Sequence, residues 1–294
     1  MKLCTFTHGQ RTRIGVVVGE LVIDLPAVVP GLPSDMIAFL QAGDEAMALA
    51  QEAQTKPDVS FPVADVVLEA PVPRPGKILA IGLNYADHVA ETGGTAPSVQ
   101  MWFNKQTTAT NRPYGSINKP SVSDTLDYEG ELAFVIGKRA KHVPKERAHE
   151  VIAGYCCGND VSVRDWQAAS RTMQIGKSFD THAPFGPWIV TADEVEDPHN
   201  LGIRTVVNDE VRQNSNTEHL IFDCFEQVEH LTKSFTLEPG DVIFTGTSSG
   251  VAAAMRPPPW LKVGDEVRIE IEKVGYIEHT VVEEDAQTVI GGPG

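Results

Sequence analysis

The middle of the chain contains the stretch Asp127-Tyr128-Glu129-Gly130-Glu131-Leu132-Ala133-Phe134-Val135-Ile136-Gly137. The run after Gly130 is apolar and partly β-branched, and it ends at a glycine followed by two basic residues, which predicts a buried strand. Because side chains alternate between the two faces of a strand, Glu129 and Glu131 project to the same side. Two like charges beside an apolar run repel each other and lose hydration, and a hard divalent cation is the simplest neutralising partner. The alternative is a solvated edge of a sheet, the usual setting of an isolated Glu-x-Glu.

Size and composition are those of a globular protein with a substantial core. The 294 residues (31.9 kDa) are enough for one large domain or two. Hydrophobic residues make up 41% of the chain and charged residues 22%, which is ordinary for a soluble protein. The net charge of −16 disfavours nucleic acids and anionic membranes as partners, since both would be repelled.

The cysteines and the N-terminus indicate a cellular compartment. Cys4, the adjacent pair at 156–157 and Cys224 match neither the spacing of a zinc site nor a disulfide framework, so we expect reduced thiols. The first nine residues contain no continuous apolar stretch, and no window approaches the length of a membrane span. We therefore expect a soluble, cytoplasmic protein.

A proline cluster at residues 71–76 divides the chain, because its prolines stiffen it into a linker. We place a boundary here between a small N-terminal α+β domain (residues 1–70) and a catalytic domain (71–294). The first domain shows the β-branched runs of a hairpin and two helical segments, the first with Ser34 as N-cap. None of its patterns suggests chemistry, so its expected role is packing or oligomer contact.

A candidate acid/base pair follows the next short apolar strand, at residues 77–83. Asn84 can cap a helix that ends at the glycine pair 93–94. His88 and Glu91 are three residues apart and share one face of this helix, so the carboxylate can raise the basicity of the imidazole. The flexible glycines behind the pair indicate a mobile lid. An ordinary surface contact between histidine and glutamate is the alternative.

Polar side chains follow a second buried strand, predicted at 151–158. Asp160 at its end is either a third oxygen ligand or the cap of the next helix. Arg164 and Gln167 share a face of that helix, and the arginine fork suits a carboxylate while the amide suits a carbonyl or hydroxyl. Lys177, beside a glycine and near an aromatic residue, is a candidate for a partly desolvated ammonium, with a surface lysine as the alternative.

The last third of the chain is rich in predicted strands. It contains a hairpin turning at 208–209, an amphipathic helix at 217–233, and two Leu-x-x-Gly-Asp turns at 237–241 and 261–265, each feeding a strand. The loop at 245–251 is made of Gly, Thr, Ser and Val and could hold a carboxylate, although it lacks the Gly-Lys-Ser/Thr of a P-loop. The whole pattern predicts an α+β, β-rich fold.

Together these segments resemble the fumarylacetoacetate hydrolase family over roughly residues 72–282. The matching motifs are Gly82-Leu83-Asn84-Tyr85 with His88 and Glu91, Tyr128-Glu129-Gly130-Glu131-Leu132, Asn159-Asp160-Val161-Ser162 with Arg164 and Gln167, Gly176-Lys177-Ser178-Phe179-Asp180, Gly186-Pro187-Trp188, and Thr245-Gly246-Thr247 with Gly250. The resemblance implies a mixed β-sandwich roll, usually a homodimer, in which carboxylates hold Mg²⁺ or Mn²⁺, with Ca²⁺ as a further possibility.

The resemblance also implies roles for nine residues, position by position. These are His88, Glu91 and Lys177 as catalytic residues, Arg164, Gln167 and Thr247 as substrate-binding residues, and Glu129, Glu131 and Asp160 as metal ligands. Fumarylacetoacetase itself has a further acidic ligand before its lid histidine, whereas no acid lies between Lys77 and Asn84 here. We therefore expect three protein ligands, with water and substrate completing an octahedron.

The expected activity is metal-dependent hydrolysis of a carbon–carbon bond in a 2,4-dioxo acid, giving pyruvate and a carboxylic acid. Acylpyruvates of aromatic catabolism, such as fumarylpyruvate or maleylpyruvate, and 2,4-diketo-3-deoxy sugar acids are the candidate substrates. In this hypothesis the cation polarises the 2-oxo group, the His88–Glu91 pair activates water and Lys177 steadies the oxyanion. The same enolate chemistry would serve an oxaloacetate-type decarboxylase or a hydroxymuconate-type isomerase. A catalytically silent protein that binds a 2-oxo acid is the third alternative.

Overall fold

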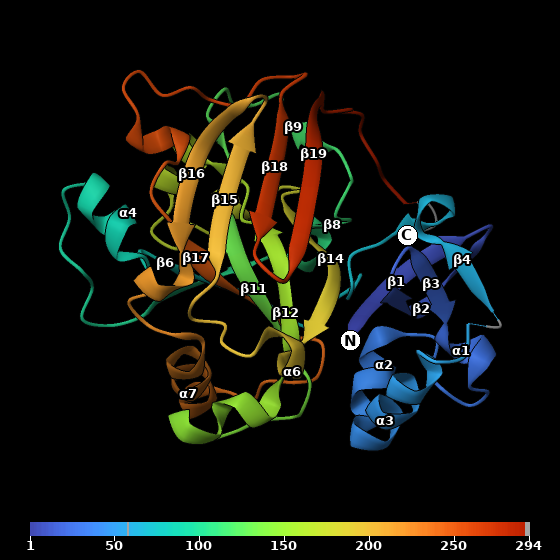
Figure 1. The fold of residues 1–294 in the computed structure, drawn as a ribbon. Coiled ribbons are helices and arrows are strands. Elements are labelled where there is room, and N and C mark those ends of the chain that lie inside the picture. Colours follow the sequence, from blue (N-terminus) through green and yellow to red (C-terminus); the bar gives the residue numbers. More distant parts are fainter. Residues whose placement is uncertain (58, 292–294) are drawn as a thin grey trace.

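The computed structural model describes residues 1–57 and 59–291, whose elements are drawn in Figure 1. The strands are β1 (Lys2–His8), β2 (Arg11–Val18), β3 (Leu21–Asp24), β4 (Ser60–Pro62), β5 (Val67–Leu68), β6 (Ile78–Gly82), β7 (Met101–Lys105), β8 (Thr110–Asn111), β9 (Ile117–Lys119), β10 (Leu126–Asp127), β11 (Gly130–Ile136), β12 (Ile152–Asn159), β13 (Ser162–Val163), β14 (Ala183–Thr191), β15 (Gly202–Val207), β16 (Glu210–Asn216), β17 (Val242–Thr247), β18 (Glu266–Ile271) and β19 (Gly275–Glu283). The α-helices are α1 (Leu25–Val28), α2 (Met36–Gln41), α3 (Gly43–Ala53), α4 (Ala86–Glu91), α5 (Arg164–Ala169), α6 (Ala192–Val195) and α7 (Cys224–Ser234). Short 3-10 helices are η1 (Val63–Asp65), η2 (Thr107–Ala109), η3 (Lys145–Val151), η4 (Ile175–Lys177), η5 (Thr217–His219) and η6 (Ala252–Ala254).

Two sheets form the body of the catalytic region. The larger sheet has 12 strands, with the main order β4-β3-β2-β1-β14-β12-β11-β17-β6-β7. The five-stranded sheet β16-β15-β18-β19-β9 packs across β11, β12 and β14 (Figure 1). Side chains of both sheets meet in one core cluster, which includes Phe134 of the larger sheet and Ile269 and Ile277 of the smaller one. This strand-rich α+β arrangement confirms the predicted fold class.

Strand β11 confirms the buried strand predicted from residues 130–137. All seven of its residues are buried, and it lies between β12 and β17, with which it pairs in antiparallel fashion. A strand covered on both faces reads as a continuous apolar run, as this one does after Glu131. At its start, a Cβ added to Gly130 would lie 2.3 Å from Thr205 Oγ1 of the smaller sheet, so only glycine allows this close approach.

The first 70 residues contain the predicted hairpin, β2 and β3, and two helices, α2 and α3. The predicted cap was wrong by one residue, since the Asp35 carboxylate, not Ser34, accepts the Ala38 N–H at 2.9 Å. Strand β1 pairs with β14, so this region continues the larger sheet. The boundary at residues 70/71 stays a prediction, and residues 292–294 of the second predicted domain lie outside the described part of the chain.

Helical predictions later in the chain hold with shifted starts. The segment at 217–233 begins with a 3-10 turn, and the α-helix starts only at Cys224, because Asp223 forms a capping box with Glu226. The helix predicted after Asp160 is α5, which begins at Arg164. The predicted hairpin is present as β15 and β16. None of the described helices is long and apolar enough to span a membrane.

Candidate active site

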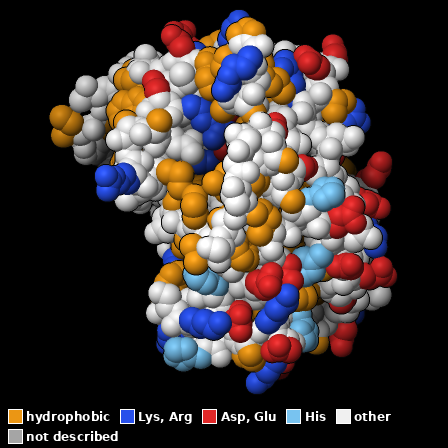
Figure 2. Space-filling view, turned by 90° about the vertical axis from the view of Figure 1, so that its left-hand side faces the viewer, with side chains coloured by type: hydrophobic (Ala, Val, Ile, Leu, Met, Phe, Trp, Pro, Cys, Tyr) orange, Lys and Arg blue, Asp and Glu red, His pale blue; other side chains and the backbone are white. Residues whose placement is uncertain are grey.

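A cavity of about 230 Å³ lies at the ends of β6, β11 and β17, under the short helix α4. Figure 2 looks onto the side of the molecule that carries α4, where Lys or Arg side chains lie in a recess bordered by hydrophobic side chains. Six of the nine predicted site residues line the cavity, and the other three adjoin them. The lining residues are Ile81, Gly82, Leu83, His88, Met101, Phe103, Glu129, Arg164, Gln167, Met173, Lys177 and Thr247.

Three carboxylates meet beside the cavity: Glu129, Glu131 and Asp160. One oxygen of each lies within 4.8 Å of the others, and all three residues are buried. The pairing of β11 with β12 brings them together, since the Asp160 N–H donates to the Glu129 carbonyl at 2.9 Å. Burial, and then the charges of Asp160 and Glu129, raise the pKa of Glu131 well above its usual value.

This donor set fits a divalent cation. Three buried oxygen ligands close together suit Mg²⁺, Mn²⁺ or Ca²⁺, which prefer carboxylate oxygens. The Gly246 N–H donates to Glu131 Oε2 at 2.7 Å and so orients this carboxylate. Gly246 has φ +100°, and a Cβ there would lie 2.8 Å from the Cβ of Asn84, so the position requires glycine. The role of the three residues as ligands stays a prediction.

Two buried lysines balance the acidic cluster. Lys177 Nζ lies 2.7 Å from Glu129 Oε2 and 2.8 Å from Asp160 Oδ2. Lys105 Nζ contacts Asp160 Oδ1 and donates to the Val161 carbonyl at 3.2 Å. Burial opposes the charge of Glu129, but Lys177 and Arg164 outweigh it and lower its pKa to about 2. The ammonium of Lys177 is therefore buried and paired, as its sequence context suggested.

Lys105 was not among the predicted site residues. Along β7, Met101, Phe103 and Lys105 share one face of the strand. Met101 and Phe103 line the cavity, so Lys105 also lies on the cavity side of the strand. This alternation is the sequence signal that could have identified the lysine. Its buried position, with a side chain 0% exposed, makes it part of the charge balance of the site.

Arg164 links the acidic cluster to a fourth buried acid. Its guanidinium contacts Glu129 Oε1 at 2.6 Å and Asp127 Oδ2 at 2.7 Å, and it donates to Gln167 Oε1 at 3.0 Å. The Asp127 carboxylate also accepts the backbone N–H groups of Ala252 and Ala253, at 2.9 and 3.0 Å. Arg164 and Gln167 share one face of α5, as predicted, and Asp127 is the residue that holds the arginine in place.

Thr247, at the end of β17, contributes a hydroxyl to the cavity wall. It donates to the Gly130 carbonyl at 2.9 Å and accepts from Gln213 Nε2 at 2.8 Å. The buried amide of Gln213 also accepts from the Gly130 N–H at 2.9 Å. Gln213 thus connects Thr247 to the start of β11, although no sequence motif singled it out.

Helix α4 carries the predicted acid/base pair. His88 Nδ1 lies 2.6 Å from Glu91 Oε1, and their side chains are 13% and 22% exposed. The predicted helix cap was wrong, because Tyr85 occupies the N-cap position. The amide of Asn84 instead donates to the carbonyls of Phe222 and Thr245, at 2.9 and 2.8 Å. Asn84 therefore attaches the start of α4, the predicted lid, to two distant segments.

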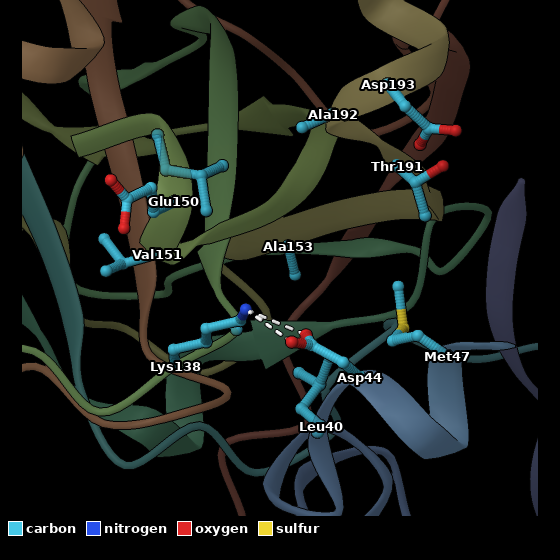
Figure 3. A pocket seen from close by; sticks show the side chains of 13 residues that line it. Leu40, Asp44, Met47, Lys138, Glu150, Val151, Ala153, Thr191, Ala192 and Asp193 are labelled. Carbon is cyan, nitrogen blue, oxygen red and sulfur yellow. Dashed lines mark hydrogen bonds and ion pairs between the residues drawn. The ribbon is translucent and has the colours of Figure 1, made fainter. Parts of the chain in front are cut away.

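A second cavity, of about 260 Å³, lies between α2 and α3 and the far ends of β12 and β14 (Figure 3). Leu40, Met47 and Ala153 give it an apolar lining, and Lys138 and Asp44 form an ion pair of 2.8 Å at its edge (Figure 3). None of the clustered carboxylates lines it. The acidic cluster therefore adjoins the cavity under α4 and not this one.

The fold and the buried polar site define an enzyme that acts on a small molecule. Residues 77–282 match the family model described as fumarylacetoacetate (FAA) hydrolase C-terminal. The chain therefore belongs to the fumarylacetoacetate hydrolase family, which confirms the resemblance seen in the sequence. The family contains hydrolases and tautomerases.

Known relatives cover almost the whole chain. An oxaloacetate tautomerase of Xenopus laevis, named as mitochondrial, is 42% identical over 288 residues, which are 96% of this chain and 90% of the relative. One solved structure is a maleylpyruvate hydrolase from Sphingobium sp. SYK-6 with manganese(II) and pyruvate. It has a TM-score of 0.79 at 33% identity, and the match covers 96% of this chain and 99% of that protein's chain. A 5-carboxymethyl-2-hydroxymuconate delta-isomerase from Mycobacterium smegmatis has a TM-score of 0.77 at 36% identity, and the match covers 97% of this chain and 99% of that protein's chain.

Proposed function

We propose that this enzyme is a metal-dependent tautomerase that interconverts the keto and enol forms of a small 2-oxo acid such as oxaloacetate. The observation that carries the proposal is the 42% identity, over 96% of the chain, with an oxaloacetate tautomerase. It favours the isomerase alternative over the carbon–carbon hydrolysis that we expected first. The cytoplasmic location and the homodimer stay predictions.

The cation site is assigned to Glu129, Glu131 and Asp160, with Mg²⁺ or Mn²⁺ as the expected ion and Ca²⁺ as a further candidate. A divalent cation there would polarise the 2-oxo group and so increase the acidity of the adjacent C–H bond. Arg164 and Gln167, which line the cavity, are proposed to orient the carboxylates of the acid. Thr247 offers a hydroxyl to the same substrate.

The proton transfer is assigned to the pair on the lid helix. Glu91 accepts from Nδ1 of His88, which leaves Nε2 able to exchange a proton with carbon 3 of the acid. When His88 removes this proton, the C–H electrons form the C2–C3 double bond, and the electrons of the C2–O double bond move to the oxygen. The oxygen then takes up a proton from solvent, and His88 releases the proton from carbon 3 to solvent, so no net proton is gained or lost. Lys177 supplies an N–H donor beside the carboxylates, suited to the charge that develops on this oxygen. No water molecule is consumed.

Hydrolysis of an acylpyruvate is the second candidate function. The structural similarity to a maleylpyruvate hydrolase favours it, and the same His88–Glu91 pair could activate a water molecule. The two reactions therefore differ in what the base deprotonates, a carbon of the substrate or a water.

A substrate panel separates the two candidates. The purified protein with Mg²⁺ or Mn²⁺ is mixed with oxaloacetate while the ultraviolet absorbance of the enol is followed, and pyruvate release from acylpyruvates is measured with a coupled dehydrogenase. A tautomerase brings the enol to equilibrium faster than buffer with metal alone and releases no carbon dioxide. Pyruvate release from an acylpyruvate, without faster enol relaxation of oxaloacetate, would show the tautomerase proposal to be wrong.

A further inference from the structure

The lid helix α4 presents two carboxylates to one loop. Asp87 and Glu91 are four residues apart and therefore lie on the same face of the helix. Both contact the segment that follows β17, Asp87 at Ser249 and Glu91 at Gly250, whose N–H donates to Glu91 Oε2 at 3.0 Å. Glu91 is already assigned to His88, whereas Asp87 has no part in the proposed chemistry.

Asp87 receives hydroxyl groups from two separate elements. Ser215 Oγ of β16 donates to its Oδ2 at 2.6 Å, and Ser249 Oγ donates to the same oxygen at 3.3 Å. The carboxylate also accepts the N–H of His88 at 2.7 Å, so it is attached to the backbone of the catalytic pair. Ser215 and Ser249 each follow by two residues a member of the Gln213–Thr247 contact in the cavity wall. Asp87 therefore joins the lid to the opposite wall of the cavity.

The segments on the two sides of α4 differ in how many contacts hold them. Just before the helix, Asn84 donates to two distant carbonyls, and within the helix the side chain of Val89 is buried. After its end, the segment 92–96 is exposed. Together with the buried Val89, the contacts of the helix with Ser215, Ser249 and Gly250 therefore set the position of His88 and Glu91.

We propose that Asp87 is a positioning residue whose hydrogen bonds with Ser215 and Ser249 hold the lid over the cavity. We call these two contacts the latch. It acts on the reaction through His88, whose placement it sets, and this part of the argument rests on the proposed function. The latch itself is a property of the fold and can be measured without any substrate.

The test compares Asp87→Ala, the double variant Ser215→Ala/Ser249→Ala, and the triple variant by hydrogen–deuterium exchange of the amides of residues 89–92. A hydrogen bond to a charged group contributes enough that its loss raises lid opening, and hence exchange, roughly tenfold. Because Asp87→Ala already removes both serine contacts, the triple variant should exchange about as fast as Asp87→Ala alone. Asp193→Ala is the matched control, since this exposed aspartate is also the second residue of a short helix, α6.

The second readout is kinetic. In the proposed reaction the lid supplies the base, whereas Arg164, Gln167 and Thr247 bind the substrate, so kcat should fall several-fold with little change in KM. Exchange of the amides of α3, which lies on the opposite side of the molecule from α4 (Figure 1), should stay at the wild-type rate in every variant.

Three outcomes would overturn the latch: unchanged exchange of residues 89–92, additive effects in the triple variant, or faster exchange throughout the chain. If the protein shows no tautomerase activity but the lid exchange behaves as expected, the latch stands and the proposed function fails. The two inferences are therefore tested separately.

Discussion

Replacing Gly130 by alanine tests how closely the active site depends on the contact between the two sheets. A Cβ at this position would lie 2.3 Å from Thr205 Oγ1, 3.1 Å from Gln213 Oε1 and 3.3 Å from Ile269 Cγ2. The first distance is about 1 Å shorter than an ordinary contact, so β11 or the smaller sheet must move. Overpacking of this kind lowers the free energy of unfolding by about 1–3 kcal/mol.

The same shift should reach the metal site, because Gly130 stands between Glu129 and Glu131. A displacement of about 1 Å at a site of this kind costs on the order of a hundredfold in activity. Urea unfolding gives the loss of stability, and Mn²⁺ titration followed by electron paramagnetic resonance gives the affinity. Gly202→Ala in β15 is the control, since its Cβ would have no neighbour closer than 3.6 Å.

A second substitution makes the reasoning refutable. Thr205→Ala removes the nearest clashing atom, so Gly130→Ala/Thr205→Ala should recover part of the stability and of the Mn²⁺ affinity relative to Gly130→Ala. If Gly130→Ala is as stable as the wild type and binds Mn²⁺ equally well, the close approach of the two sheets does not control the site.

The remaining predictions concern single residues of the site and of the fold. Glu129→Ala should abolish Mn²⁺ binding and turnover together, as measured by calorimetry and the enol assay, and turnover without metal would contradict the scheme. Gln213→Leu removes the donor to the Thr247 hydroxyl and the acceptor of the Gly130 N–H, so it should lower the free energy of unfolding by about 2 kcal/mol or more in urea titrations. Asp223→Ala removes the capping box of α7 and should cost about 1 kcal/mol of stability with unchanged turnover, while a loss of activity at full stability would refute a purely structural role.

Local patterns of the sequence predicted two of the arrangements seen around the cavity. The alternation along β11 placed Glu129 and Glu131 on one side, and both lie in the buried acidic cluster with Asp160. The three-residue spacing of His88 and Glu91 predicted their contact, which is present at 2.6 Å. These predictions succeeded because each depends only on the geometry of one strand or one helical turn.

The choice of reaction could not be read from the same residues. Glu129, Glu131, Asp160 and His88 would serve hydrolysis, decarboxylation or tautomerisation, since all three pass through the same kind of enolate. The comparison with an oxaloacetate tautomerase over 96% of the chain moved the proposal from hydrolysis to tautomerisation.

The sequence alone determined the strand-rich class, the buried central strand and the order of the site motifs, because periodicity and turn chemistry are local. Only the tertiary structure decided the partners of these motifs: Lys105 at Asp160, Asp127 under Arg164, and Ser215 at Asp87, 128 residues away in the chain. Such contacts depend on the register between strands and loops that are distant in sequence, and no local pattern contains this register. For the same reason Asn84, which has the residue type of a helix cap, binds Phe222 and Thr245 instead.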